Sequence, residues 1–373
     1  MPITAYSKFY KRELDAHQLE SLFQGESQTE HSSFQDFVLF DVECPSCNVS
    51  GGYAVKEGYS KITGKRVSQA HFAFKNTSGG DAHLAFCEFN STNEKQNSIA
   101  NEGKVDYRES KSLITQHVGL IVSIGIENNI FTQSDMRNMR GWIINIRKQG
   151  QENLDMSPHI INLAQSLARR SKRNFDKYVF DISAAKEDMF NIDKEVYESL
   201  CHRFPNFDLS KHFRDNGFYS DIKKRDVAKK AANILKAAKG EYYFDRNILN
   251  EKFTLARKLT GKIVKHDDYL SRKLSPSAFL KSNPLMALSS LLLFTSDWDS
   301  EKAWMKVENI YKISSVKDSN LGNFIGLNPF ANYSAWVIIK KLSFLNNAYY
   351  DSVDFDILFQ EEKSRLMKLY GLQ

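Results

Sequence analysis

Two short motifs dominate the sequence: CPSC at positions 44–47 and HLAFC at positions 83–87. In CPSC the two-residue spacer lets both sulfurs reach one ion at about 2.3 Å. In HLAFC the histidine and the cysteine are four residues apart, so both side chains share one face of either a helix or a strand. The pattern predicts a structural zinc site of the Cys3His type, with four protein ligands and no open position for a catalytic water. The predicted ligands are Cys44, Cys47, His83 and Cys87.

An alternative fourth ligand is His71, which precedes Phe72 on a strand-like segment and could replace His83 or support the site indirectly. A purely structural interpretation also exists, in which the cysteines are small buried residues and the histidines lie on the surface. The combination of CxxC with HxxxC favours metal over this alternative, because CxxC occurs often but the pair does not.

The sequence around these motifs is expected to be β-rich. Segments 34–42 (FQDFVLFDV), 66–74 (RVSQAHFAF) and 117–126 (HVGLIVSIGI) are rich in valine, isoleucine and phenylalanine, which favour strands. Glycines at positions 51–52, 64 and 79–80 predict turns near the first two segments.

From Thr132 onward the pattern becomes helical. Thr132 and Asp135 form a helix start signal, and Asn283 with Pro284 forms another. The expected fold class is α+β: a β-rich, zinc-bearing N-terminal module at residues 1–128, then a mainly α-helical region at residues 129–373. A sub-boundary is expected near residue 205, where Phe204-Pro205 interrupts the helical pattern.

Residues 40–110 resemble the N-terminal zinc segment of CoiA-like competence proteins. The shared text is CPSC at 44–47, Gly64-Lys65-Arg66, HFAF at 71–74, then Cys87 and Glu109-Ser110. Phe74 stands where that family has the second histidine of an HFAH strand. The resemblance implies a zinc knuckle and a prokaryotic or phage setting.

A weak candidate for catalysis is Glu109-Ser110-Lys111, which fits the E-x-K element of PD-(D/E)xK nucleases, with Asp81 or Asp106 as the upstream acid. Such enzymes hold a divalent metal that polarises water. The alternative interpretation is a solvated turn, because three-residue patterns of common residues arise by chance. Signatures of P-loop proteins, of GxSxG hydrolases and of HExxH proteases are missing from the sequence.

Charge is concentrated in one part of the chain. The net charge is +6, yet residues 211–281 hold 18 Lys+Arg against 8 Asp+Glu, or 18 − 8 = +10. Aromatic residues interleave with these cations, and the combination is typical of nucleic-acid binding, with DNA or RNA as the partner. The alternative is a solvated helix face. The predicted contacts on the helix expected at 223–239 are Lys223, Lys224, Arg225, Lys229, Lys230 and Lys236.

The remaining signals concern location and function class. No signal-peptide pattern follows Met1, and the longest apolar run, 284–294, is shorter than the roughly 20 residues of a membrane span. We therefore expect a cytoplasmic protein without membrane contact. Its expected function is a nucleic-acid-binding accessory protein with structural Zn²⁺. A metal-dependent nuclease and a protein–protein adaptor are the two alternatives.

Overall fold

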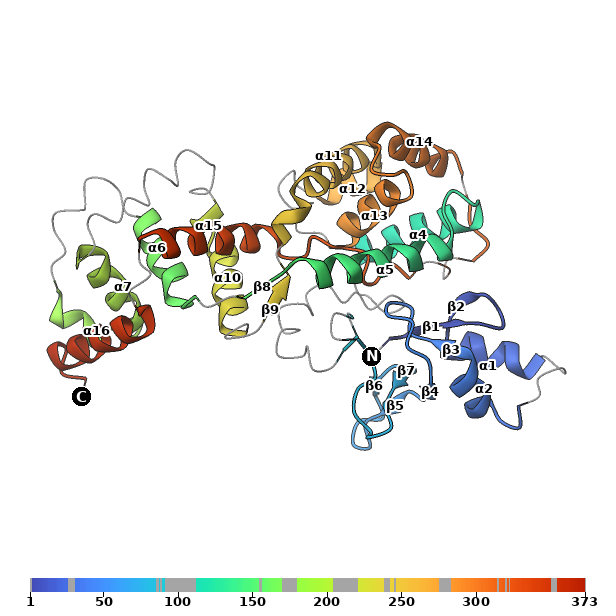
Figure 1. Cartoon of the computed structure of the whole chain (residues 1–373), viewed down its shortest axis with the longest axis horizontal. Coiled ribbons are helices and arrows are strands. Elements are labelled where there is room, and N and C mark those ends of the chain that lie inside the picture. Colours follow the sequence, from blue (N-terminus) through green and yellow to red (C-terminus); the bar gives the residue numbers. More distant parts are fainter. Residues whose placement is uncertain are drawn as a thin grey trace. The chain divides into compact units, whose positions relative to one another are not determined.

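A computed structural model of the chain describes most of its residues (Figure 1). The described residues are 2–25, 31–84, 87, 89–90, 112–153, 156–169, 180–203, 221–237, 242–244, 246–274, 283–313, 315–318, 321, 323–349 and 354–372. They form two compact units, each made of two segments of chain. Unit 1 comprises Met1–Gln149 with Leu249–Ala331, and unit 2 comprises Gly150–Ile248 with Asn332–Gln373. Residue 128 lies inside unit 1, and residue 205 lies outside the described residues.

The fold mixes helices and strands and is mainly helical, with most strands short and close to the N-terminus. In unit 1 the strands pair antiparallel, in the order β2-β1-β3, β4-β7 and β5-β6. Two helices, α1 and α2, accompany them (Figure 1). The bounds are β1 (Thr4–Ser7), β2 (Arg12–Asp15), α1 (Ala16–Gly25), α2 (Phe34–Asp41), β3 (Val42–Glu43), β4 (Gly52–Val55), β5 (Gly58–Tyr59), β6 (Arg66–Ser68) and β7 (His71–Phe74).

One apolar core contains residues of β1, β2, α1, α2, β3 and β7. Gly52 is needed where β4 crosses it, because a Cβ there would lie 2.7 Å from Val42 Cγ2 and 2.8 Å from the Phe74 ring. Three of the cysteines, Cys44, Cys47 and Cys87, are part of this core rather than of the surface. Its most deeply buried members are Ala5, Leu19, Phe37, Val38, Val42, Cys44, Phe72 and Cys87.

Two segments expected as strands are helices instead. Residues 34–41 of the first segment form α2, where Ser33 caps the helix by accepting the backbone N–H of Asp36 at 3.1 Å, and Val42 begins β3. Segment 117–126 lies within α4 (Leu113–Glu127), where Val118, Ile121 and Val122 are buried at helical spacing. Strand propensity is a weak preference, and in both segments capping and burial override it.

The rest of unit 1 is helical. The capping pair of Thr132 and Asp135 is confirmed at the start of α5: each backbone N–H bonds to the other side chain, at 2.7 and 3.1 Å. Helix α13 is buried on nearly every side and packs against α4, α5, α11 and α14 (Figure 1). The bounds are α5 (Gln133–Gln149), α11 (Asn250–His266), α12 (Asp268–Lys273), α13 (Asn283–Phe294) and α14 (Ser300–Tyr311). The short helix η5 (Arg246–Leu249) ends at the first residue of the second segment of unit 1.

Unit 2 is a helical assembly with one pair of strands, β8 and β9. Helix α6 packs against α7, α10 and α15, and α16 packs against α7. The bounds are β8 (Gln151–Asn153), α6 (His159–Arg169), η4 (Ile182–Lys186), α7 (Ile192–Arg203), α10 (Arg225–Ala237), β9 (Tyr242–Phe244), α15 (Tyr333–Tyr349) and α16 (Phe355–Leu369). Among the described helices of both units, none has the length and hydropathy to cross a bilayer.

Candidate metal centre

Four side chains converge in the core of unit 1: Cys44, Cys47, His83 and Cys87. Their ligand atoms all lie within 4.8 Å of one another. The separations are 3.8 Å from Cys44 Sγ to Cys87 Sγ, 3.4 Å from Cys47 Sγ to His83 Nδ1 and 3.6 Å from Cys87 Sγ to His83 Nδ1. Tetrahedral zinc with its usual bond lengths places sulfur atoms about 3.8 Å apart, and sulfur and nitrogen about 3.5 Å apart. These three separations therefore match a tetrahedral metal site, and the arrangement of the four atoms is compatible with one.

The first half-site is a tight turn between α2 and β4. Backbone hydrogen bonds close it: Cys44 N–H donates to Val49 O at 2.9 Å, and Asn48 N–H donates to Cys44 O at 3.1 Å. Asn48 has a φ of 61°, in the left-handed region that asparagine tolerates better than most residues. Within the turn, Ser46 N–H points at Cys44 Sγ at 3.4 Å. The turn thus aims backbone dipoles at the sulfur, as stabilising a thiolate requires.

The second half-site follows β7. Asp81 Oδ1 accepts the backbone N–H of His83 at 2.8 Å, and the buried Asn90 donates to the carbonyls of His83 and Leu84 at 2.8 and 3.1 Å. The N–H of Phe89 points at Cys87 Sγ at 3.4 Å. These bonds fix the loop from both ends, so that His83 and Cys87 face the first half-site.

The cluster is closed to solvent: all four residues are buried. None of the four cysteines of the chain is in a disulfide. Burial raises the pKa of the Cys44 thiol, and the nearby Cys47 and Cys87 raise it further. Hydrogen bonds from Cys44 and Cys87 lower the pKa of Cys47. A divalent cation would supply the charge that lets all three sulfurs ionise, with release of protons as it binds.

His71, the alternative ligand, is not part of this cluster. It lies on β7, and its Nδ1 is 2.8 Å from the carbonyl oxygen of Gln69. The geometry therefore selects His83, whose ring also contacts Phe74 and Phe89 edge-on or tilted.

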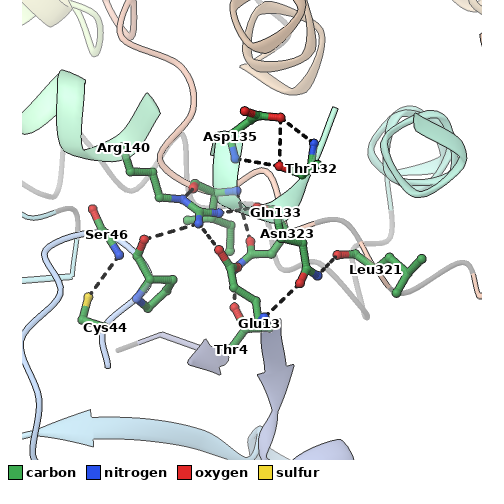
Figure 2. A network of polar contacts seen from close by, with 12 residues as sticks. Thr4, Glu13, Cys44, Ser46, Thr132, Gln133, Asp135, Arg140, Leu321 and Asn323 are labelled. Atoms are coloured by element: carbon green, nitrogen blue, oxygen red, sulfur yellow. Dashed lines mark hydrogen bonds and ion pairs between the residues drawn. The ribbon is translucent and has the colours of Figure 1, made fainter. Parts of the chain in front are cut away.

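A buried polar network connects the first half-site to the helical part of unit 1 (Figure 2). At its centre is Arg140 of α5, only 1% exposed. Its guanidinium donates to the Glu13 carboxylate, to the Asn323 carbonyl, to Ile325 O at 3.0 Å and to Pro45 O at 3.4 Å. Pro45 is the second residue of CPSC, so α5 holds the turn that carries two of the ligands.

Other contacts extend this network. Gln133 bridges two segments, since its Oε1 accepts Glu13 N–H at 3.0 Å and its Nε2 donates to Leu321 O at 2.8 Å (Figure 2). Burial raises the pKa of Glu13, and the Arg140 charge opposes that effect. Neither Glu13 nor Arg140 was predicted from the sequence, because a lone acid on a short strand and an arginine in a basic helix carry no local signal of burial.

Of the candidate nuclease residues, the structure describes only Asp81. Asp81 holds the His83 loop through its backbone bond. Glu109, Lys111 and Asp106 lie outside the described residues.

The predicted nucleic-acid contacts lie on or just before α10, in unit 2. Lys223, Lys224, Arg225, Lys229 and Lys236 are exposed, and Lys230 is half-buried. Lys224 is paired with Asp221 at 2.6 Å. The opposite face of the helix is buried, with Ala228, Ala231, Ile234 and Leu235 in the core.

Comparison with known proteins adds no family to this geometry. The chain matches no family model, and it matches neither a curated protein nor a solved structure. The chemistry of the site is therefore argued from its own donor atoms and surroundings.

Proposed function

We propose that this chain is a nucleic-acid-binding accessory protein whose N-terminal module is stabilised by a zinc ion. Three thiolates and one imidazole are a soft donor set, which suits Zn²⁺ and does not suit Mg²⁺ or Ca²⁺. The prokaryotic or phage setting is proposed on the CoiA-like resemblance alone.

The zinc is proposed to be structural rather than catalytic. Four protein ligands complete a tetrahedral shell, so no position is left for a water to be activated. The three cysteines belong to the apolar core that contains residues of α1 and α2, and His83 is buried as well. Metal binding at such a position contributes directly to folding.

One observation supports nucleic-acid binding most strongly: a stripe of exposed cations on α10. Arg225, Lys229 and Lys236 follow one another at i, i+4 and i+11, which places them within about 40° of each other around a helix. Within the described part of unit 2, no carboxylate forms an ion pair with any of the three. Such cations can neutralise phosphates and release counterions.

The other predicted cations contribute less to this surface. Lys224 already faces Asp221, and Lys230 is only partly exposed. The stripe of Arg225, Lys229 and Lys236 is therefore the part to test.

The test compares two triple variants of the full chain. Arg225→Glu/Lys229→Glu/Lys236→Glu removes the stripe. Lys186→Glu/Lys194→Glu/Lys368→Glu makes the same charge change at exposed positions elsewhere in unit 2. Fluorescence anisotropy with labelled single- and double-stranded DNA and RNA, at several salt concentrations, reads out affinity.

The wild type should bind with a logarithmic affinity that falls linearly with the logarithm of salt concentration. The stripe variant should lose most of that affinity and about two to three units of salt slope, with its thermal melting unchanged. The control should bind nearly as well as the wild type. Absence of wild-type binding at low salt, or equal loss in both variants, would overturn the proposal and favour an adaptor function.

A further inference from the structure

A second cationic stripe lies on α11, in unit 1. Its buried face is formed by Ala256, Leu259, Thr260, Ile263 and Val264. Three lysines lie on the opposite side at i, i+4 and i+7, namely Lys258, Lys262 and Lys265, and all are exposed. Along a helix this spacing puts the Cα atoms of neighbouring lysines about 6 and 4.5 Å apart in axial height, and all three within about 60° of one another around the axis.

None of these lysines is neutralised by a carboxylate among the described residues of unit 1. From Asn250 to Lys273 the chain has seven Lys+Arg and three Asp+Glu, or 7 − 3 = +4. One of those three acids, Asp267, is buried and bonded to His117 and Tyr311. The segment that carries α11 and α12 is therefore positively charged, which favours an anionic partner.

An aromatic ring adjoins the stripe. Lys262 Nζ lies 5.3 Å from the centroid of the Trp304 indole, and His266 meets the same ring edge-on at 5.3 Å. Trp304, on α14, is only half-buried, and its indole N–H donates to Glu308 Oε1 at 2.9 Å. The bond fixes the orientation of a ring that solvent still reaches.

We infer that this surface, formed by Lys258, Lys262, Lys265 and Trp304, binds a single-stranded nucleic acid. The lysines neutralise consecutive phosphates, and the indole stacks on an unpaired base. This combination of a cationic track with a stacking ring is how proteins bind single strands without reading their sequence. The inference rests on the proposed nucleic-acid function and adds to it a strand preference and a second binding surface, separate from α10.

The test again uses the full chain and labelled probes: an oligothymidylate of about 20 nucleotides and a duplex of the same length. Lys258→Glu/Lys262→Glu/Lys265→Glu removes the cationic track. Trp304→Leu removes the stacking ring but keeps an apolar side chain. The charge-matched control is Lys302→Glu/Lys312→Glu/Lys317→Glu, at exposed positions of the same unit. Circular-dichroism melting verifies that each variant is folded.

The track variant should bind oligothymidylate far more weakly than the control, with a salt slope reduced by about two units. Trp304→Leu should bind it about ten-fold more weakly while leaving the salt slope unchanged, because stacking releases no counterion. Duplex binding should change less in both. The inference would be overturned if the track variant bound oligothymidylate as tightly as the wild type does. It would also be overturned if the variants lost affinity equally for the duplex and for the single strand.

Failure of this inference is distinguishable from failure of the proposed function. If the α10 variant loses binding and the α11 variants do not, the proposed function stands and the inference falls. If the wild type binds neither probe at low salt, both fall.

Discussion

Arg140 of α5 and Pro45 of the CPSC turn are joined by a hydrogen bond of 3.4 Å between guanidinium and carbonyl, inside the core of unit 1. The same guanidinium also binds the Glu13 carboxylate and the carbonyls of Asn323 and Ile325. One side chain therefore connects the metal turn, strand β2, helix α5 and the segment that follows α14. If the CPSC turn holds a metal ion, we expect removal of the Arg140 side chain to weaken both metal binding and the packing of α5.

Arg140→Met should destabilise the protein by about 3–5 kcal/mol, the usual result of removing one partner from a buried ion pair. Its other effect should be weaker zinc retention, because the Pro45 turn loses its support. Urea unfolding followed by circular dichroism measures the first effect, and zinc release to a chelator measures the second.

The matched control for that variant is Arg147→Met on the same helix, where the side chain is only partly buried. It should change stability by less than about 1 kcal/mol. A double variant, Glu13→Leu/Arg140→Met, should be less destabilised than the sum of its single changes, because it leaves no lone buried charge. Strict additivity would contradict the network.

Helix α4 contains a glycine, Gly125, at a position with no room for a side chain. A Cβ on Gly125 would lie 2.4 Å from Phe131 Cζ, and Phe131 is 2% exposed. Gly125→Ala should therefore destabilise unit 1 by about 1–3 kcal/mol through overpacking. Gly141 in α5 has nothing within 4 Å of its Cβ position, so Gly141→Ala should stabilise by about 0.5–1 kcal/mol. Thermal melting of the two variants should move in opposite directions, and movement in the same direction would refute this packing.

Asp267 should make stability depend on pH. Burial by itself raises the pKa of this carboxyl, but hydrogen bonds from His117 and Tyr311 outweigh it and lower the pKa to about 2. A depressed carboxyl pKa stabilises the fold above the unfolded-state value of about 4, and this contribution is lost as the pH falls toward 2.

Asp267→Asn should therefore be less stable than the wild type at neutral pH by about 2 kcal/mol, and the difference should shrink between pH 4 and pH 2. Asp268→Asn, at the exposed neighbouring position, is the control and should show almost no difference. The measurement is urea unfolding at a series of pH values. A difference between wild type and Asp267→Asn that stays constant down to pH 2 would contradict the assignment.

The four residues of the candidate metal site could be predicted from the sequence because their spacing is local within each half-site. CPSC and HLAFC each bring two donors to one face, and the structure needed only to bring the two pairs together. The choice between His71 and His83 was less certain from the sequence. It depends on how the chain turns after β7, where Asp81 directs the loop through a bond to the His83 backbone.

Other features could not be predicted in this way. Segments 34–42 and 117–126 have strand-like composition, but the Ser33 cap and the burial of Val118, Ile121 and Val122 make them helical. Arg140 looks like any other cation of a basic helix, since its acceptors Glu13, Asn323 and Ile325 are far away in the sequence. Such contacts exist only after the chain has folded.

The four residues of the Cys3His cluster should each be needed for zinc binding. His83→Ala should lose zinc because it removes one of four donors, and Cys44→Ser should lose zinc and unfold the N-terminal part of unit 1. His71→Ala is the matched control, since the same change is made at a histidine outside the cluster, and it should keep its zinc.

The metal content of the freshly purified chain tests the zinc site directly. The zinc-to-protein ratio is measured by elemental mass spectrometry, with the cysteines kept reduced. If the Cys3His cluster binds zinc, we expect about one zinc per chain in the wild type and in His71→Ala, and much less in His83→Ala. A wild-type protein without metal, or one whose zinc depends on His71 and not on His83, would contradict this expectation.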